Sequence, residues 1–477
     1  DAGKEIIVYA EYGIGNMDYM LLSLADKIII PEMTGVDIKG LNIEVQFIKG
    51  LLDTLDIVPE VFRVNYSGKS YKTAGDQFLN KKMSNEMREN YTSLFGGIYD
   101  IYSDNISKGR EWGKEKTLDT IDKGPCSARD CQDRGIIDSI MYKDDFEKYM
   151  SDIKIIKSND IIIDNTYNYN WKDKKKKNIA IIYAVGGIQS GNSNPGPKGS
   201  TVMGDKTIME AIKTARKDKS IDAIVLRIDS GGGSALASDQ MWKEVYNTTV
   251  QDSSNIKPFI ASMSDVAASG GYYIACQADT IVASPATITG SIGVISIYPN
   301  FSQLIKRYGI TSDKIKFGKR SDFLSLANRL SNKYEKDIIQ KEINSIYSIF
   351  KDKVLLGRKN LSEKTNMDLI AMGRVYTGTQ ALNNEEGSLV DIVGGLDKAI
   401  ETAMEMLGAK DLTKFHLIEY PKHQSTKDIL KTQIDAARTV SIEDIYGSSE
   451  INDYIEFLDL VSKDPNQALL PVSIKIK

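Results

Sequence analysis

The chain has 477 residues, more than one ordinary hydrophobic core accommodates, so we expect two or three domains. Its hydrophobic content of 41% and charged content of 26% are typical of a globular protein, and a net charge of −4 gives no reason to expect nucleic acid as a partner. The chain opens with Asp1-Ala2-Gly3-Lys4, without a starting Met or a signal peptide, and passes directly into a strand pattern. We therefore expect it to begin inside a domain.

Cysteine and histidine content limits the possible chemistry. Three cysteines are too few for a disulfide scaffold, and the sequence has no C-x-x-C pair that would indicate a zinc site. Cys126 and Cys131 can pair in an oxidising compartment, but two free thiols fit the sequence at least as well. The two histidines, His416 and His423, lie late in the chain, and nothing in the sequence supports a Ser-His-Asp triad.

An internal repeat divides the chain. When Asp26 is aligned with Asp279, an offset of 253 residues holds without gaps over a long stretch. Two tandem copies of one unit are the economical explanation. The aligned pairs include Lys4 with Lys257, Tyr19 with Tyr272, Ala25 with Ala278, Ile28 with Ile281 and Gly40 with Gly293.

The second copy is the fuller one and predicts the fold class. Strand patterns at 179–185 and 221–228 alternate with a helical pattern at 206–218, which indicates an α/β fold with a mostly parallel sheet. Another strand pattern stands at 415–420, and helical patterns lie between 426 and 461. We expect four parts: a first repeat at 1–150, a linker at 151–177, a second repeat at 178–410 and a C-terminal tail at 411–477 without recognisable chemistry.

Ser269 stands between small residues where an apolar strand pattern turns into a helical one. Such a serine exposes its hydroxyl beside backbone N–H groups, which suits a nucleophile next to an anion hole. The alternative is a helix N-cap serine with packing glycines. Gly231 to Gly233 follow the 221–228 strand, and we expect them to open a helix and, with the N–H of Gly270, to line an oxyanion site. The base would be a desolvated lysine, which composition alone does not identify.

Several segments resemble the signal peptide peptidase A family in its long, two-repeat protease IV form, a peptidase family of the Clp-protease/crotonase-like superfold. The resemblance covers most of residues 4–410 and implies two tandem Clp-protease/crotonase-like repeats with mostly parallel sheets. The segments that carry it are Ile224–Ser234, Ala267–Tyr273, Thr289–Gly293, Gly373–Ala381 and Gly387–Asp391.

The resemblance implies a serine–lysine dyad. The nucleophile falls on Ser269, and the general base falls on Lys72 in Tyr71-Lys72-Thr73-Ala74. Lys69 is a weaker candidate, because extra residues precede Lys72 in this chain. Without the family, Lys72 would be read as an ordinary surface lysine.

The family also implies the groups around the dyad. A serine that hydrogen-bonds the lysine amine falls on Ser291, and the oxyanion hole falls on Gly232 or Gly233 together with Gly270. One departure is Gly231, which stands where the family usually has Pro; glycine adopts the same φ with less rigidity.

The first repeat departs from this pattern. At the offset of 253, Ser269 corresponds to Asn16 and Ser291 to Ile38, so the first repeat has no nucleophile. The first repeat would supply the lysine and the second the serine, and a complete site would need both. Whether the two residues meet within one chain or between subunits stays open.

The resemblance implies a serine endopeptidase that degrades cleaved signal peptides and other apolar, extended peptides at the outer face of the bacterial cytoplasmic membrane. It also implies a ring-like homo-oligomer, a tetramer, with membrane association through an N-terminal segment absent from this chain, and no metal or other cofactor. Two alternatives remain: an acyl-CoA-handling enzyme of the same superfold, and an inactive envelope scaffold that binds peptides. The preferred cleavage site stays undefined.

Overall fold

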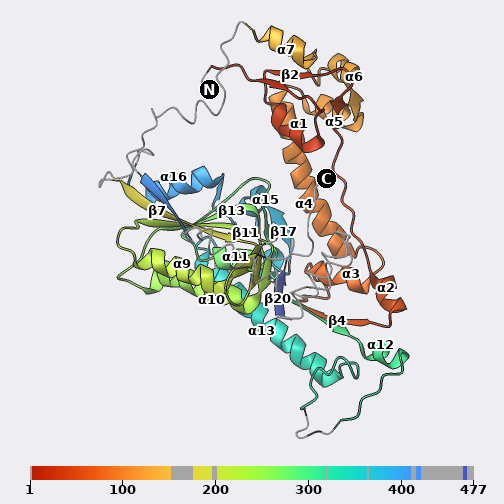
Figure 1. The fold of residues 1–477 in the computed structure, drawn as a ribbon. Helices are drawn as coiled ribbons and strands as arrows, with labels where there is room; N and C mark the ends of the chain where they lie inside the picture. The colour runs from red at the N-terminus through yellow and green to blue at the C-terminus, as the bar shows by residue number, and fades with distance from the viewer. Residues whose placement is uncertain are drawn as a thin grey trace. The chain divides into compact units, whose positions relative to one another are not determined.

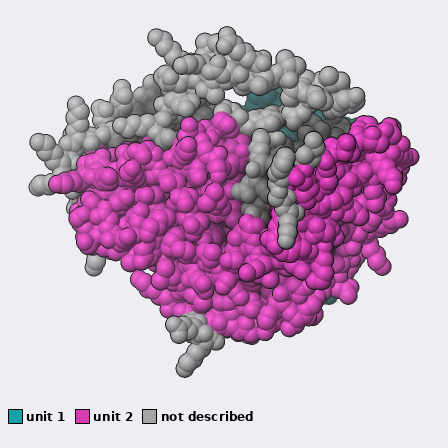
Figure 2. Space-filling view, turned by 90° about the horizontal axis from the view of Figure 1, so that it is seen from below, with its two compact units in different colours: residues 1–44, 95–173, 476–477 teal, residues 45–94, 174–475 magenta. Residues whose placement is uncertain are grey.

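The computed structural model describes residues 3–151, 176–195, 201–314, 316, 320–361, 365–409 and 415–420, and the backbone of 466–469. The chain forms two compact units, coloured separately in Figure 2. Unit 1 comprises residues 1–44, 95–173 and 476–477, and unit 2 comprises residues 45–94 and 174–475. Residues 45–94 of the first repeat therefore pack with the second repeat. The division at 150, 177 and 410 stays a prediction about the repeats, and the predicted helices between 426 and 461 lie outside the described residues.

Unit 2 is built on a mostly parallel sheet (Figure 1). Among its described pairings, β17 is the antiparallel member, through β15. The strand order is β17 (Val375–Thr377), β15 (Ile288–Gly290), β13 (Phe259–Ala268), β11 (Ala223–Ser230), β7 (Lys177–Val185) and β19 (Phe415–Tyr420), with β14 (Thr280–Ala283) on β13 and β18 (Ile392–Val393) on β14. These strands confirm the predicted strands at 179–185, 221–228 and 415–420, with small shifts at the first two.

The central strands are buried on both faces, which explains their near-continuous apolar sequences. Along β11, Ile224 and Leu226 face one core cluster, whereas Ala223 and Val225 face another. The first face is covered by α9 (Asp205–Lys217), α10 (Ala235–Tyr246), α11 (Gly270–Ala275) and α13 (Lys333–Gly357), and the second by α16 (Leu396–Met406). Figure 1 shows α9 and α10 on the opposite side of the sheet from α16.

A second sheet of unit 2 gathers segments that are far apart in the sequence. Its order is β4 (Val58–Arg63), β16 (Ile295–Asn300), β20 (Asn466–Leu469), β12 (Gly232–Ser234), β8 (Gly187–Gln189), β10 (Thr201–Gly204) and β9 (Asn194–Pro195). The antiparallel pairing of β4 with β16 brings the chain around Lys72 into this unit. The expectation that the glycine run opens a helix was wrong, because Gly232 and Gly233 lie in β12 and α10 begins at Ala235.

Unit 1 contains a smaller parallel sheet, β1 (Ile7–Tyr9), β2 (Lys27–Ile30) and β6 (Ser139–Ile140), and an antiparallel pair, β3 (Gly35–Val36) and β5 (Cys126–Ser127). Its helices include α1 (Asn16–Leu22), α5 (Lys114–Asp122), α6 (Ala128–Asp133) and α7 (Lys143–Tyr149). The remaining elements are α2 (Lys49–Thr54), η1 (Thr73–Gly75), α3 (Asp76–Leu79), α4 (Asn85–Gly109), η4 (Asn247–Gln251), α12 (Ser302–Arg307), α14 (Met367–Ile370) and α15 (Gly378–Leu382).

The strand registers follow the sequence repeat residue by residue. Ile7 pairs with Lys27 in unit 1, and the residues 253 positions later, Ile260 and Thr280, pair in unit 2. Buried hydrogen bonds recur as well: Tyr19 Oη donates to the Ile136 carbonyl at 2.8 Å, and Tyr272 Oη donates to the Leu389 carbonyl at 2.9 Å. The two copies thus share one local fold, and the expected tandem repeat is confirmed.

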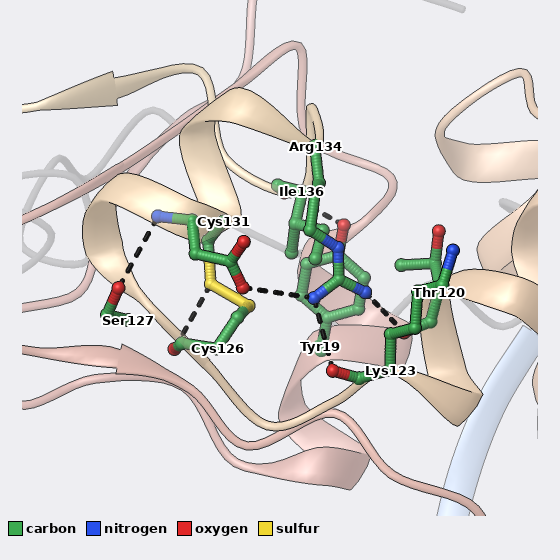
Figure 3. The surroundings of a disulfide bond; sticks show 9 residues. Tyr19, Thr120, Lys123, Cys126, Ser127, Cys131, Arg134 and Ile136 are labelled. Carbon is green, nitrogen blue, oxygen red and sulfur yellow. Dashed lines mark hydrogen bonds and ion pairs between the residues drawn. A yellow bond between two sulfur atoms is a disulfide. The ribbon is translucent and has the colours of Figure 1, made fainter.

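A disulfide joins Cys126 and Cys131 beside the start of α6 (Figure 3). Cys131 is fully buried, and Ser127 caps the helix by accepting from the Asp130 N–H. Arg134 fixes the far end of this segment by donating to the Thr120 carbonyl at 2.8 Å. The cysteine state that the sequence leaves open is therefore an intrachain bridge, and Cys276 is the described free cysteine.

None of the helices in the described part of the chain is both long enough and apolar enough to cross a bilayer.

Candidate active site

Ser269 lies at the turn between β13 and α11, with φ 56° and ψ −115°. A positive φ costs a non-glycine residue about 1–2 kcal/mol, and such strain persists where the surroundings hold the residue in place. Here the Ser269 N–H donates to the Gly290 carbonyl at 2.8 Å. Ser269 occupies the N-cap position of α11, but its hydroxyl makes no capping bond. The N-cap reading therefore does not explain this serine.

The Lys72 side chain reaches Ser269 within one chain. Its Nζ lies 2.7 Å from Ser269 Oγ, although 197 residues separate the two positions. Lys72 is fully buried and precedes the short helix η1. Its backbone is held by Arg63, whose Nη1 donates to the Lys72 carbonyl at 3.3 Å, and by the Tyr71 N–H, which donates to the Met372 carbonyl at 2.9 Å.

Ser291 completes the surroundings of the amine. Lys72 Nζ lies 3.0 Å from Ser291 Oγ and 3.1 Å from the Ser291 carbonyl oxygen. A neutral amine has two N–H donors and one lone pair. In an uncharged amine, two donors directed at Ser291 would leave the lone pair to accept the proton of the Ser269 hydroxyl. The three contacts fit this arrangement, and they equally fit the three N–H donors of an ammonium.

Burial lowers the pKa of Lys72 well below its ordinary value of 10.5. The cause is desolvation, which disfavours the ammonium form. The hydrogen-bond partners of the amine are neutral oxygens of Ser269 and Ser291, which do not compensate a positive charge as a carboxylate would. This environment favours a lysine that can accept a proton.

Lys69 does not join this group. It is exposed, and its backbone forms two hydrogen bonds of 3.0 Å with Tyr66 across a tight turn. Ser67 and Gly68 at the turn have φ values of 51° and 80°. The extra residues in this chain therefore form a surface turn before Lys72 and leave Lys72 in the interior.

Two of the three glycines expected to form an anion hole, Gly233 and Gly270, lie where a side chain does not fit. A Cβ atom on Gly270 would lie 3.2 Å from the Gly232 Cα and 2.6 Å from Ser238 Oγ. A Cβ atom on Gly233 would overlap the backbone of Ile188. The backbone after Ser269 and the β12 backbone thus approach each other closely. The Gly232 N–H donates to Ser230 Oγ at 3.2 Å.

Sequence reasoning gave no role to the loop around Gly373, which holds the dyad from one side. Gly373 has φ +85°, and a Cβ atom there would lie 2.5 Å from the Lys72 backbone nitrogen. The next residue, Arg374, accepts a hydrogen bond of 2.6 Å from the Ser291 N–H through its carbonyl. The segment Gly373–Ala381 is one of those that carry the family resemblance. Its contact with Lys72 could not be predicted from the sequence and is seen only in the structure.

The corresponding place in the first repeat holds no such pair. Asn16 is buried, and its Oδ1 accepts from the Lys39 N–H at 2.9 Å and from Tyr102 Oη at 2.7 Å. Asn16 is the first residue of α1 and is not among the residues with positive φ. Ile38, opposite Ser291 in the alignment, is fully buried in the unit 1 core. The Asn16 side chain thus has a structural role in this core.

The fold and the site define an α/β protein of the Clp-protease/crotonase-like class with a buried serine–lysine pair. The model of Peptidase family S49 matches residues 1–157 and 251–410, and the chain belongs to this family. The match in two segments agrees with the two repeats.

Similar proteins carry related names. "Serine protease SPPA, chloroplastic" of Arabidopsis thaliana is 32% identical over 438 residues, which cover 90% of this chain and 62% of that protein. "Protease 4" of Haemophilus influenzae is 33% identical over 438 residues, which cover 87% of this chain and 66% of that protein. The chain thus spans about two thirds of the length of these relatives or slightly less. A solved structure of the 1510-N membrane-bound stomatin-specific protease with a substrate peptide matches at 16% identity, over 54% of this chain and 98% of that one, with a TM-score of 0.28.

Proposed function

We propose that this protein is a serine endopeptidase in which Lys72 activates Ser269. The observation that carries the proposal is the separation of 2.7 Å between Lys72 Nζ and Ser269 Oγ in a fully buried site. A serine hydroxyl is a weak nucleophile until an adjacent base takes its proton, and a lysine can do so near neutral pH when burial lowers its pKa.

The chemistry follows from these positions. The neutral Lys72 amine takes the proton of Ser269 while Oγ bonds to the carbonyl carbon of the peptide. The oxyanion that forms is stabilised by backbone N–H groups of Gly270 and of Gly232 or Gly233. The Lys72 ammonium gives its proton to the leaving amine as the C–N bond breaks, which leaves an ester on Ser269. Water, deprotonated by Lys72, then hydrolyses the ester and restores Ser269.

We propose cleaved signal peptides and other apolar, extended segments as the substrates, at the outer face of the bacterial cytoplasmic membrane. A relative in Enterococcus faecium, 33% identical over 215 residues, carries the name "Putative signal peptide peptidase SppA", which supports this substrate class. The Cys126–Cys131 disulfide agrees with an oxidising compartment outside the cytoplasm.

The test measures hydrolysis of apolar peptides by the chain and by its Ser269→Ala and Lys72→Ala variants. Removing the general base should lower kcat/KM by about 10²–10⁴-fold, and Ser269→Ala should abolish acyl-enzyme formation. Lys69→Ala is the control, because Lys69 lies on the exposed turn, and it should retain full activity. Hydrolysis that survives Ser269→Ala would refute the proposal.

The same assay separates the alternatives. An acyl-CoA-handling enzyme would bind CoA thioesters and leave peptides intact. An inactive scaffold would bind the peptides without cutting them, and its affinity would not depend on Lys72.

We further propose a ring of identical chains, with four copies as the expected number. The offset of 253 relates β4 to residues 311–316 and β16 to residues 42–47. The described residues of these two segments belong to no strand, whereas β4 and β16 pair with each other. A second copy can therefore form the equivalent pairing between 311–316 of one chain and 42–47 of the next. Such head-to-tail contacts produce closed rings when the rotation closes.

Light scattering on the purified chain gives the number of copies. Ile43→Pro removes a backbone donor from the proposed edge and should dissociate the ring. A chain that is monomeric at all concentrations would contradict this assembly.

A further inference from the structure

The side chain of Arg374 lies against the residue that precedes the candidate base. Its guanidinium carbon is 3.6 Å from the centre of the Tyr71 ring, and its Nη1 is 3.2 Å from Glu89 Oε1. Tyr71 Oη donates to the same carboxylate, at 2.8 Å from Oε2. Arg374, Tyr71 and Glu89 thus form a closed set of contacts, which we call the arginine clamp.

The arginine clamp joins segments of the two repeats. Tyr71 and Glu89 belong to the first copy and Arg374 to the second, and all three lie in unit 2. The backbone of Arg374 also contacts the site, since its carbonyl accepts from the Ser291 N–H at 2.6 Å. One residue therefore holds Ser291 through its backbone and the segment of Lys72 through its side chain.

The contacts of the clamp require an arginine. Tyr71 is buried, and a guanidinium that stacks on an aromatic face keeps its N–H donors free for a carboxylate. The hydrogen bond from Tyr71, together with Arg374, holds the pKa of Glu89 below its ordinary value, so Glu89 is a carboxylate at neutral pH. A lysine has neither the planar stacking surface nor the fork of donors, so it cannot make both contacts at once.

The first repeat shows that the fold itself does not require this arginine. In both units an antiparallel strand pairs at equivalent positions, related by the offset of 253. These pairs are Thr377 with Ile288 in unit 2 and Ser127 with Gly35 in unit 1. Counting back from Thr377 and Ser127 by the same number of residues, Arg374 corresponds to Gly124. A Cβ atom on Gly124 would overlap the carbonyl oxygen of Ile38, the counterpart of Ser291. The copy without a nucleophile thus keeps the strand pairing and has no room for the arginine.

We propose that Arg374 is a positioning residue, which through Tyr71 fixes Lys72 at hydrogen-bonding distance from Ser269. The proposal rests on the proposed peptidase function. Lys72 follows Tyr71 directly, so a displacement of the Tyr71 ring moves the start of the lysine side chain. Ser291, the other contact of the amine, is held by the same arginine. Loss of the clamp therefore slows proton transfer from Ser269, whereas peptide binding stays the same.

The first experiment measures hydrolysis of a fluorogenic apolar peptide by the Arg374→Met and Arg374→Lys variants. Both should lower kcat by about 10–100-fold with KM unchanged, because a small misplacement of a catalytic group is costly in rate. Arg320→Met is the matched control. The Arg320 guanidinium carbon lies 3.8 Å from the centre of the Tyr334 ring, a similar stack outside the site, and its loss should leave kcat unchanged. An unchanged kcat for Arg374→Met would overturn the proposal.

A double-variant cycle tests whether Arg374 acts through Tyr71. Tyr71→Leu removes the ring and should lower kcat as Arg374→Met does, and the two changes together should cost no more than the larger one alone. Losses that add in full would overturn transmission through Tyr71. Tyr71→Phe keeps the stacked ring and should restore most of the kcat that Tyr71→Leu loses. A merely structural role would lower Tm and leave kcat per folded molecule unchanged.

Crystal structures of the unchanged chain and of Arg374→Met test the geometry without catalysis. We expect Lys72 Nζ and Ser269 Oγ to lie within hydrogen-bonding distance in the unchanged chain and more than about 3.5 Å apart in the variant. A separation that is the same in both structures would overturn the positioning role. If the unchanged chain hydrolyses no peptide, the peptidase proposal fails, while this comparison still decides whether Arg374 holds the pair together.

Discussion

Ser291 contacts the Lys72 amine through two atoms, its Oγ at 3.0 Å and its carbonyl oxygen at 3.1 Å from Nζ. Ser291 itself has φ 51°, and its N–H donates to the Arg374 carbonyl. The backbone that orients the amine is thus fixed from the opposite side. In the proposed mechanism Ser291 is a positioning residue, because it would act on the reaction through Lys72.

Ser291→Ala should lower kcat by about 10–100-fold, because a small displacement of the base is costly in rate. KM should change little. Without the Ser291 Oγ, the ammonium form of Lys72 loses one hydrogen-bond acceptor, which lowers the pKa of Lys72 further. The acid limb of the pH–rate profile should therefore move to lower pH. A merely structural role would leave that limb in place while reducing the amount of folded protein, and circular dichroism measures the latter.

The pH dependence of the unchanged protein follows from the buried base. Burial holds the pKa of Lys72 well below 10.5, and only the neutral amine accepts the serine proton. We therefore expect kcat/KM to rise with pH through the folded-state pKa of Lys72 and to reach its plateau well below pH 10.5. An acid limb with its midpoint near 10.5 would show that the base is a solvated lysine.

Lys72→Met should make the protein more stable and inactive. The folded-state pKa of Lys72 is lower than its unfolded-state pKa, so between these two values the unfolded chain binds more protons. The free energy of unfolding therefore rises with pH across that window, and below it the buried amine costs stability. Methionine has a similar volume and no charge, so Tm at neutral pH should rise and lose this slope. Calorimetry over a pH series measures both effects, and a lower Tm for the variant would contradict the argument.

Gly373→Ala tests the loop that holds Lys72. Its Cβ would lie 2.5 Å from the Lys72 nitrogen, and the backbone has a positive φ of +85°. Gly309→Ala is a matched control, because Gly309 has φ +69° and nothing lies within 4 Å of an added Cβ. Both variants should lose about 1–2 kcal/mol of stability from the positive φ. Only Gly373→Ala should also lose about 10²-fold in kcat, through displacement of Lys72. Equal activities would show that this contact does not position the base.

Replacing Cys126 and Cys131 with Ala should destabilise unit 1. These substitutions alter none of the residues of the Ser269 site. The bridge spans five residues in sequence, and closing such a short loop contributes about 2 kcal/mol by the chain-entropy model. In denaturant unfolding under oxidising conditions, the variant should have a lower free energy of unfolding than the unchanged protein. After the disulfide of the unchanged protein is reduced, this difference should disappear. Cys276→Ala is the control, because Cys276 is outside the bridge, and it should leave the redox dependence unchanged.

The repeat and the parallel sheet could be predicted from the sequence because local sequence patterns indicate both of them. Buried strands such as β7 and β11 are continuous apolar runs, and the offset of 253 survives in the strand registers. The lysine was different. Nothing local marks Lys72 as buried, so its assignment depended on the family resemblance.

Long-range pairing explains what the sequence did not show. The pairing of β4 with β16 joins positions more than 230 residues apart, and it places residues 45–94 in unit 2. β20 is four residues long and forms its bonds through the backbone, which any sequence can do. The state of Cys126 and Cys131 depends on their distance in the fold, which spacing in the sequence did not settle.

The two halves of the dyad descend from different repeats, since Lys72 belongs to the first copy and Ser269 to the second. If each repeat were a separate polypeptide, the Lys72–Ser269 pair would form only when two molecules associate, and dilution would dissociate them. The single chain makes formation of the pair a unimolecular event. The dyad should therefore persist at any concentration at which the chain folds, whatever the number of chains in the assembly.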